Sequence, residues 1–179
     1  MLHRNDTALL VIDIQDKLVR VMHDEAALLD KASRLIQGAQ IIGLPMIVTE
    51  QYPRGLGTTV KEIVGVLESY NPLEKRVFGC CDDTGFVEQL EQAECKNLLV
   101  CGIETHVCVY QTVSQLLENR YHVEVVADAV DSRTPFDKHI GLERMQTQGA
   151  FLTTAEMALF ELQQVAQGEQ FKAISSVIK

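Results

Sequence analysis

The chain has 179 residues, of which 46% are hydrophobic and 23% charged, and its formal net charge is −9. This size and composition are typical of a globular protein with a substantial core, so we expect a single domain over residues 1–179. The negative charge argues against nucleic acid as a partner, because binding to phosphates depends on clustered lysine and arginine. No apolar run approaches the ~20 residues that cross a bilayer, and we find no secretory pattern, which predicts a cytoplasmic protein without a membrane partner.

The five cysteines are an odd number in a sequence without an export signal, which disfavours a disulfide framework. They include no C-x-x-C pair, and the five histidines do not fall at metal-binding spacing. We therefore expect no metal and no cofactor.

Short apolar runs alternate with longer amphipathic segments along the chain. Continuous apolar runs predict strands buried on both faces, at residues 7–12, 45–49, 98–101 and 123–127, with shorter strands at 72–75 and 150–153. Apolar residues at spacings of three and four predict helices at 25–42, 58–67, 84–92, 106–119, 135–148 and 154–165. The tail after Gly168 is expected to fray. This alternation predicts an α/β fold in three layers, with helices on both faces of a mostly parallel sheet.

Three polar residues, Asp13, Lys75 and Cys108, each follow the apolar part of a predicted strand. In an open parallel sheet, ligands bind beyond the carboxyl ends of the strands, so we expect the three side chains to face one crevice. Cys108 falls where a buried strand leads into a helix, and the free N–H groups and dipole of a helix N-terminus favour a thiolate. Cys108 is therefore the candidate nucleophile, and the alternative is a buried structural cysteine.

These residue types match the needs of a cysteine hydrolase. Such an enzyme requires a thiolate, a group that moves protons, and donors for the oxyanion of the tetrahedral intermediate. Asp13 could carry the proton if burial made it a stronger base, and Lys75 would supply positive charge. The loop before Cys108 offers backbone N–H groups for the oxyanion.

Three ordered sequence blocks resemble the motifs of the isochorismatase-like cysteine hydrolase family: Val11 to Asp16, Glu74 to Phe78 and Gly102 to Val109. Asp128 to Arg133 and Thr153 to Glu156 are similar to its later segments. The resemblance implies a six-stranded, Rossmann-like sheet and a catalytic triad of Asp13, Lys75 and Cys108. It also implies a cis peptide bond at Ile103–Glu104, an oxyanion hole formed by the N–H groups of Glu104 and Cys108, and a homo-oligomer, commonly a dimer or tetramer.

The sequence departs from the nicotinamidases of this family, which carry an Asp-x-His metal-ligand element after the second strand. Here that place reads Thr49 to Gly55 and contains no histidine, so we expect a metal-free site and a substrate other than nicotinamide. We assign substrate binding to Glu50, Gln51, Tyr52 and Phe78; the alternative for the loop that begins with Glu50 is a solvated segment without a role.

Three functions remain open from the sequence. The first is hydrolysis of a small amide-type substrate through a thioester on Cys108. The second is isochorismatase-type hydrolysis of an enol ether, which would use Asp13 and Lys75 without covalent catalysis. The third is a small-molecule-binding or interaction module that keeps the fold and has lost activity.

Overall fold

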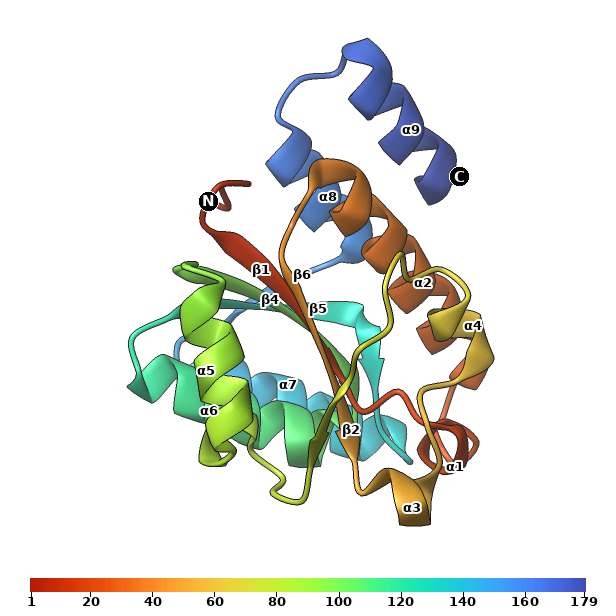
Figure 1. The fold of residues 1–179 in the computed structure, drawn as a ribbon, viewed down its shortest axis with the longest axis vertical. Coiled ribbons are helices and arrows are strands. Elements are labelled where there is room, and N and C mark those ends of the chain that lie inside the picture. Colours follow the sequence, from red (N-terminus) through yellow and green to blue (C-terminus); the bar gives the residue numbers. More distant parts are fainter.

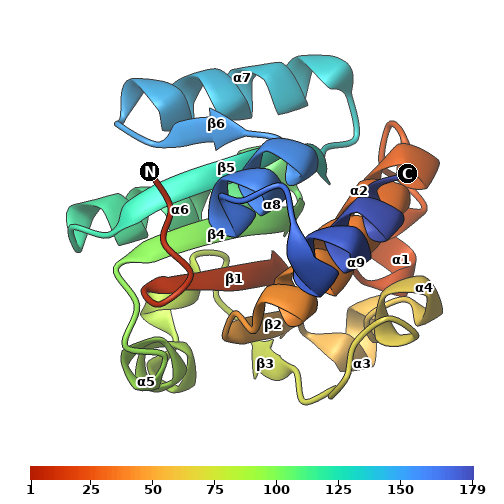
Figure 2. The same cartoon turned by 90° about the horizontal axis from the view of Figure 1, so that it is seen from above.

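The computed structural model describes all residues from 1 to 179. Its six strands form one parallel sheet in the order β3-β2-β1-β4-β5-β6 (Figures 1 and 2). The strands are β1 (Thr7–Ile12), β2 (Met46–Gln51), β3 (Leu73–Lys75), β4 (Asn97–Ile103), β5 (His122–Asp131) and β6 (Phe151–Thr153). The expected six-stranded α/β fold is confirmed.

The structure also contains nine α-helices and two irregular turns. The helices are α1 (Asp16–Val19), α2 (Glu25–Ile42), α3 (Pro53–Leu56), α4 (Lys61–Val64), α5 (Thr84–Gln92), α6 (Tyr110–Glu118), α7 (Pro135–Thr147), α8 (Ala155–Gln163) and α9 (Gly168–Ile178). A 3₁₀ turn spans Cys80–Asp82, and a π-helical turn spans Thr105–Val109. None of the helices combines the length and apolarity that crossing a membrane requires.

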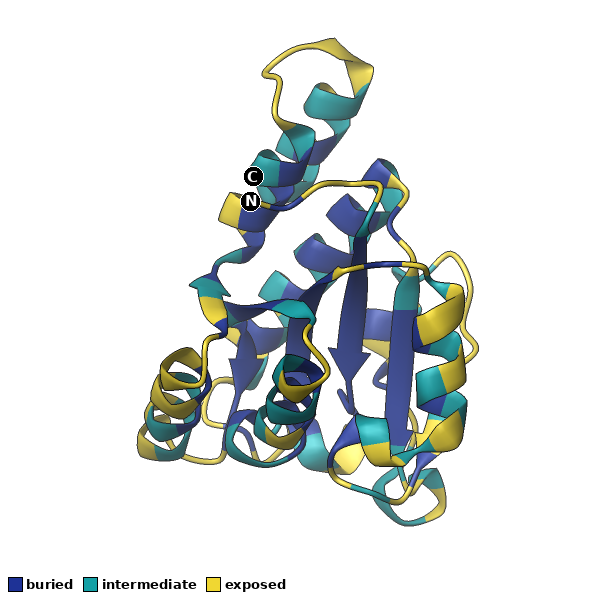
Figure 3. Ribbon diagram, turned by 90° about the vertical axis from the view of Figure 1, so that its left-hand side faces the viewer, coloured by how far each residue is buried: buried dark blue, intermediate teal, exposed yellow.

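Two apolar clusters hold the layers together. The first packs α2, α4, α8 and α9 on one face of the sheet, and the second packs α5, α6 and α7 on the other (Figure 2). The strands between them are almost entirely buried, whereas the helices expose their outer surfaces (Figure 3). Burial on both faces explains why the strand sequences are continuously apolar rather than alternating.

The bounds of α2 agree with the sequence pattern because both ends carry clear signals. The Asp24 side chain accepts a hydrogen bond from the Ala27 N–H at the start, and Gly43 ends the helix in a left-handed conformation with φ of 84°. The predicted and observed bounds of α5 also agree.

Two expectations are wrong. The helix expected at 58–67 is reduced to the four residues of α4, because the residues before it cross to Gln15 as a β-bridge at Thr59 and Gly65 ends it. The tail after Gly168 does not fray but forms α9, which buries Ile174 completely. Arg34 of α2 donates to the carbonyl groups of Val177 and Ile178, which fixes the end of α9.

Gly102 lies near the carboxyl end of β4, where β4 runs close against the backbone of β1. Gly102 pairs with Ile12 and has φ of 122°, a backbone angle that residues other than glycine rarely adopt. A Cβ atom there would lie 2.0 Å from the Ile12 carbonyl oxygen. The contact therefore requires glycine, and it sets the spacing between Asp13 and the loop that leads to Cys108.

We expect Gly102→Ala to lower the free energy of unfolding by more than about 4 kcal/mol, because the added methyl group meets backbone that cannot move away. Gly149→Ala is the matched control, since Gly149 also has a positive φ of 111° but has nothing within 4 Å of the added atom. It should cost about 1–3 kcal/mol from backbone strain alone. Urea denaturation measures both, and equal losses would contradict the close-approach explanation.

Candidate active site

Asp13 and Lys75 form a buried ion pair at the carboxyl edge of the sheet. Lys75 Nζ lies 2.7 Å from Asp13 Oδ2, and both side chains are fully buried. The ammonium group also donates to Gln51 Oε1 at 2.8 Å and to the Val77 carbonyl oxygen at 3.2 Å. Buried charges are tolerated when they are paired and hydrogen-bonded, and all three protons of this ammonium have acceptors.

Cys108 lies in the π-helical turn that links β4 to α6, and the residue is 6% exposed. It belongs to the apolar cluster beneath α5, α6 and α7. Both Asp13 and Lys75 nevertheless lie close enough to act electrostatically on its thiol. The structure thus brings together the three side chains that the sequence places behind three separate strands.

The thiol of Cys108 is held in its neutral form. Burial raises its pKa above the ordinary value, the Asp13 carboxylate raises it further, and the Lys75 ammonium opposes both without prevailing. The expectation that a helix N-terminus stabilises a thiolate is therefore wrong for the resting protein. For Lys75, burial lowers the pKa, but the Asp13 carboxylate together with the nearby Cys80 and Cys108 outweighs burial and raises it.

The loop between β4 and Cys108 has the backbone that the family resemblance implied. The Ile103–Glu104 peptide bond is cis. No protein group accepts the Glu104 N–H, although the Glu104 carbonyl accepts from Val107 and Val109 at 3.0 and 3.2 Å. The Glu104 amide is therefore available to an external acceptor.

Side chains of this loop are engaged with the end of β5. The Glu104 carboxylate accepts from Arg133 Nε at 2.8 Å, and His106 Nδ1 lies 3.0 Å from Ser132 Oγ. These contacts fix the loop from outside and give neither Glu104 nor His106 a place in the Asp13 and Lys75 network.

Strand alternation divides the residues expected to bind substrate. Thr49 and Gln51 face the ion pair: Thr49 Oγ1 donates to Asp13 Oδ1 at 2.7 Å, and Gln51 holds Lys75. Glu50 points to the opposite face, where its carboxylate accepts from the backbone and hydroxyl of Thr59 at 2.6 and 2.8 Å and from the Tyr70 hydroxyl. These contacts give Glu50 the task of anchoring the segment after α3, in place of the substrate contact we expected.

The other two expected substrate-binding residues lie at the surface. Tyr52 is 42% exposed, and its ring lies 4.6 Å below the Arg76 guanidinium. It lines a hollow of about 240 Å³ whose wall includes Lys75. Phe78 is 54% exposed, and only its carbonyl oxygen approaches Lys75 Nζ, at 3.5 Å.

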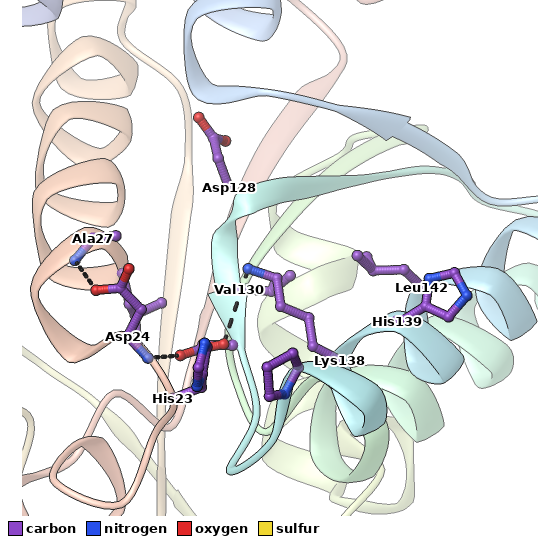
Figure 4. A pocket seen from close by; sticks show the side chains of 11 residues that line it. His23, Asp24, Ala27, Asp128, Val130, Lys138, His139 and Leu142 are labelled. Atoms are coloured by element: carbon purple, nitrogen blue, oxygen red, sulfur yellow. Dashed lines mark hydrogen bonds and ion pairs between the residues drawn. The ribbon is translucent and has the colours of Figure 1, made fainter.

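A larger cavity, of about 340 Å³, lies apart from this network between the start of α2, the end of β5 and α7 (Figure 4). Its charged groups already join these elements. Asp131 Oδ2 accepts from the Asp24 N–H at 2.8 Å, and Lys138 Nζ lies 3.9 Å from Asp131 Oδ1. In neither place are three His, Cys, Asp or Glu side chains arranged to hold a metal ion.

Sequence reasoning missed Thr49. The signal that could have found it is its position two residues before Gln51 and two after the buried Ile47, which puts it on the same face of β2 as the site. Cys80 also lies near the site: it is fully buried close to Lys75 and Asp13, and burial raises the pKa of its thiol to about 12.

Removing one partner of the buried ion pair should be far more costly than removing both. We expect Lys75→Met to lower the free energy of unfolding by about 3–5 kcal/mol, because Asp13 is left buried and uncompensated. The double variant Asp13→Asn, Lys75→Met should cost less than the sum of the two single variants, by roughly 1–3 kcal/mol.

The control for this double-mutant cycle is the pair Lys172 and Glu169. Their charged atoms also lie 2.7 Å apart, but the side chains are 71% and 89% exposed. Exposed pairs contribute less than about 1 kcal/mol. Chemical denaturation measures all the variants. Strict additivity at Asp13 and Lys75 would show that the buried pair is not coupled.

Stability should fall as the pH rises above about 9. The ordinary pKa of a thiol here is 9.0, and in the folded protein that of Cys80 is about 12. Over that interval the unfolded chain releases the proton and the folded protein keeps it, so rising pH stabilises the unfolded state relative to the folded state. Lys75, whose pKa is also raised, acts in the same direction. Unfolding free energies from pH 8 to 11 measure this. Cys80→Ala should make the fall less steep but not abolish it, because burial also raises the thiol pKa of Cys101 and Cys108.

Comparison with known proteins places this arrangement in a family. The model of the isochorismatase domain matches residues 7–157. The secreted isochorismatase effector Isc1 of Phytophthora sojae is 35% identical over 98% of this chain and 85% of its own. The structure of MAR1 ribonuclease from Caenorhabditis elegans superposes with a TM-score of 0.93 at 36% identity, over 99% of this chain and 91% of that one.

A further solved structure, YcaC from Pseudomonas aeruginosa with hexane-2,5-diol and covalent acrylamide, gives a TM-score of 0.92 at 26% identity. It covers 98% of this chain and 90% of its own. Sequence, fold and the ordered motif blocks agree, and the chain belongs to the isochorismatase family.

Proposed function

We propose that the protein is a metal-independent cysteine hydrolase that cleaves a small amide-type substrate through a thioester on Cys108. The observation that supports this most directly is the meeting of a neutral thiol with a buried carboxylate and ammonium group at the carboxyl edge of the sheet. Asp13 is a proton acceptor within this group, and membership in the family makes a hydrolase the expected class.

In the proposed reaction, Asp13 takes the thiol proton as the Cys108 sulfur attacks the substrate carbonyl carbon. The tetrahedral intermediate collapses, the C–N bond breaks, and Asp13 returns the proton to the departing nitrogen. Water then attacks the thioester, Asp13 takes a proton from it, the C–S bond breaks, and the proton returns to the sulfur. The net reaction consumes one water and yields an acid and an amine.

The backbone N–H groups of Glu104 and Cys108 are the proposed donors to the oxyanion. The Glu104 N–H has no protein acceptor, and preorganised donors at the developing charge lower the barrier without reorganisation. Lys75 holds the Asp13 carboxylate in place through the 2.7 Å ion pair. Tyr52, Gln51 and Phe78 are the proposed contacts for the remainder of the substrate.

Two relatives suggest other chemistry. One is named an isochorismatase effector and another a ribonuclease. Enol-ether hydrolysis is our second candidate, because Asp13 and Lys75 could serve it without the sulfur. Ribonuclease activity is disfavoured by the net charge of −9.

The cytoplasmic location stays a prediction, since a relative is described as secreted, and the homo-oligomer stays a proposal that sedimentation would test.

Cys108→Ala should abolish turnover, by at least about a thousandfold, and leave the fold intact. Wild type and variant are screened against small amides and ureides, with a chelator present in a parallel set that should show unchanged rates. An acyl mass increment on Cys108 during turnover separates the thioester path from enol-ether hydrolysis. Substantial activity in Cys108→Ala would refute the mechanism, and no turnover of any compound by wild type would favour a binding module.

A further inference from the structure

We propose that Thr49 is a positioning residue that holds Asp13 in the orientation and charge state that proton transfer from Cys108 requires. This inference rests on the proposed function. Thr49 lies near the carboxyl end of β2 and is 1% exposed, and its hydroxyl lies 2.7 Å from Asp13 Oδ1. It touches the carboxylate that would take the proton and makes no contact that would place it against a substrate.

The two oxygens of Asp13 have different partners. Lys75 occupies Oδ2 at 2.7 Å, and Thr49 occupies Oδ1 at the same distance. The carboxylate is thereby fixed against rotation about its last bond. Without Thr49, one oxygen of a fully buried carboxylate would lose its donor, and such a loss is costly because no water replaces it.

A hydroxyl suits this position because it can serve both protonation states of Asp13. It donates to the ionised carboxylate, and after rotation it accepts from the protonated acid. A valine fills the same volume but does neither. Loss of the hydroxyl donor destabilises the ionised carboxylate more than the protonated acid, because hydrogen bonds to a charged acceptor are roughly twice as strong as neutral ones.

The test uses acrylamide as a probe and follows its addition to Cys108 by mass spectrometry across the pH range. In this reaction the sulfur proton passes to Asp13, the sulfur bonds to the terminal alkene carbon, and the neighbouring carbon gains a proton, so thiol and alkene combine into a thioether. Peptide mapping separates Cys108 from the other four cysteines.

We expect Thr49→Val to slow the addition about tenfold near neutral pH. The acid limb of the pH–rate profile should move upward by about one pH unit, because a carboxylate that has lost a donor keeps its proton at higher pH. Thr49→Ser retains the hydroxyl and should restore both the rate and the limb. A purely structural role for Thr49 would not move the limb.

Thr7→Val is the matched control. Thr7 is also 1% exposed and also donates a 2.7 Å hydrogen bond, to the His3 carbonyl. It begins β1, however, and so lies at the amino ends of the strands, away from the site. It should leave the pH–rate profile unchanged. If Thr49→Val does not fold, Thr49→Ala replaces it.

An unshifted acid limb in Thr49→Val, or a Thr49→Ser variant as impaired as the valine variant, would overturn the assignment. The readout needs no turnover, so it does not depend on finding the substrate. Failure of the proposed function would show in a different experiment, as full hydrolytic activity in Cys108→Ala. The two failures can therefore be told apart.

Discussion

The buried ion pair between Asp13 and Lys75 is the interaction on which the site depends. Two charges lie 2.7 Å apart and out of contact with water. The free-energy cost of removing them from water is offset only because neighbouring groups satisfy every remaining donor and acceptor. The same contacts that make the pair stable also fix the carboxylate beside the sulfur. Stability and reactivity therefore rest on one set of hydrogen bonds, and the sheet topology supplies it by placing β2 between the strands that carry the two charges.

Much of the fold could be predicted from the sequence because its signals were local. Capping by Asp24 and termination at Gly43 define α2, and continuous apolar runs define the buried strands. The ordered motif blocks led to the family and to the triad. The expectations that were wrong depended on contacts between distant residues: α9 is helical because Ile174 finds a buried place and Arg34 reaches the helix end from α2.

In the site, too, features that depend on local sequence could be predicted and features that depend on distant contacts could not. Asp13, Lys75 and Cys108 could be found because each follows a strand. Strand alternation puts Thr49 and Glu50 on opposite faces of β2, but polarity does not mark which face holds the site, because the strand is buried on both faces. The pKa of the Cys108 thiol depends on the whole environment, since burial and the nearby Asp13 raise it more than Lys75 lowers it.

The neutral state of the Cys108 thiol also bears on chemical durability. Peroxides attack the thiolate far more readily than the thiol, and the products beyond sulfenic acid are not reversed by ordinary reductants. The Cys108 sulfur carries its proton at rest and belongs to a residue that is only 6% exposed, so it is shielded from such damage between catalytic cycles. The environment that lowers the reactivity of the sulfur at rest thus also protects it from oxidation.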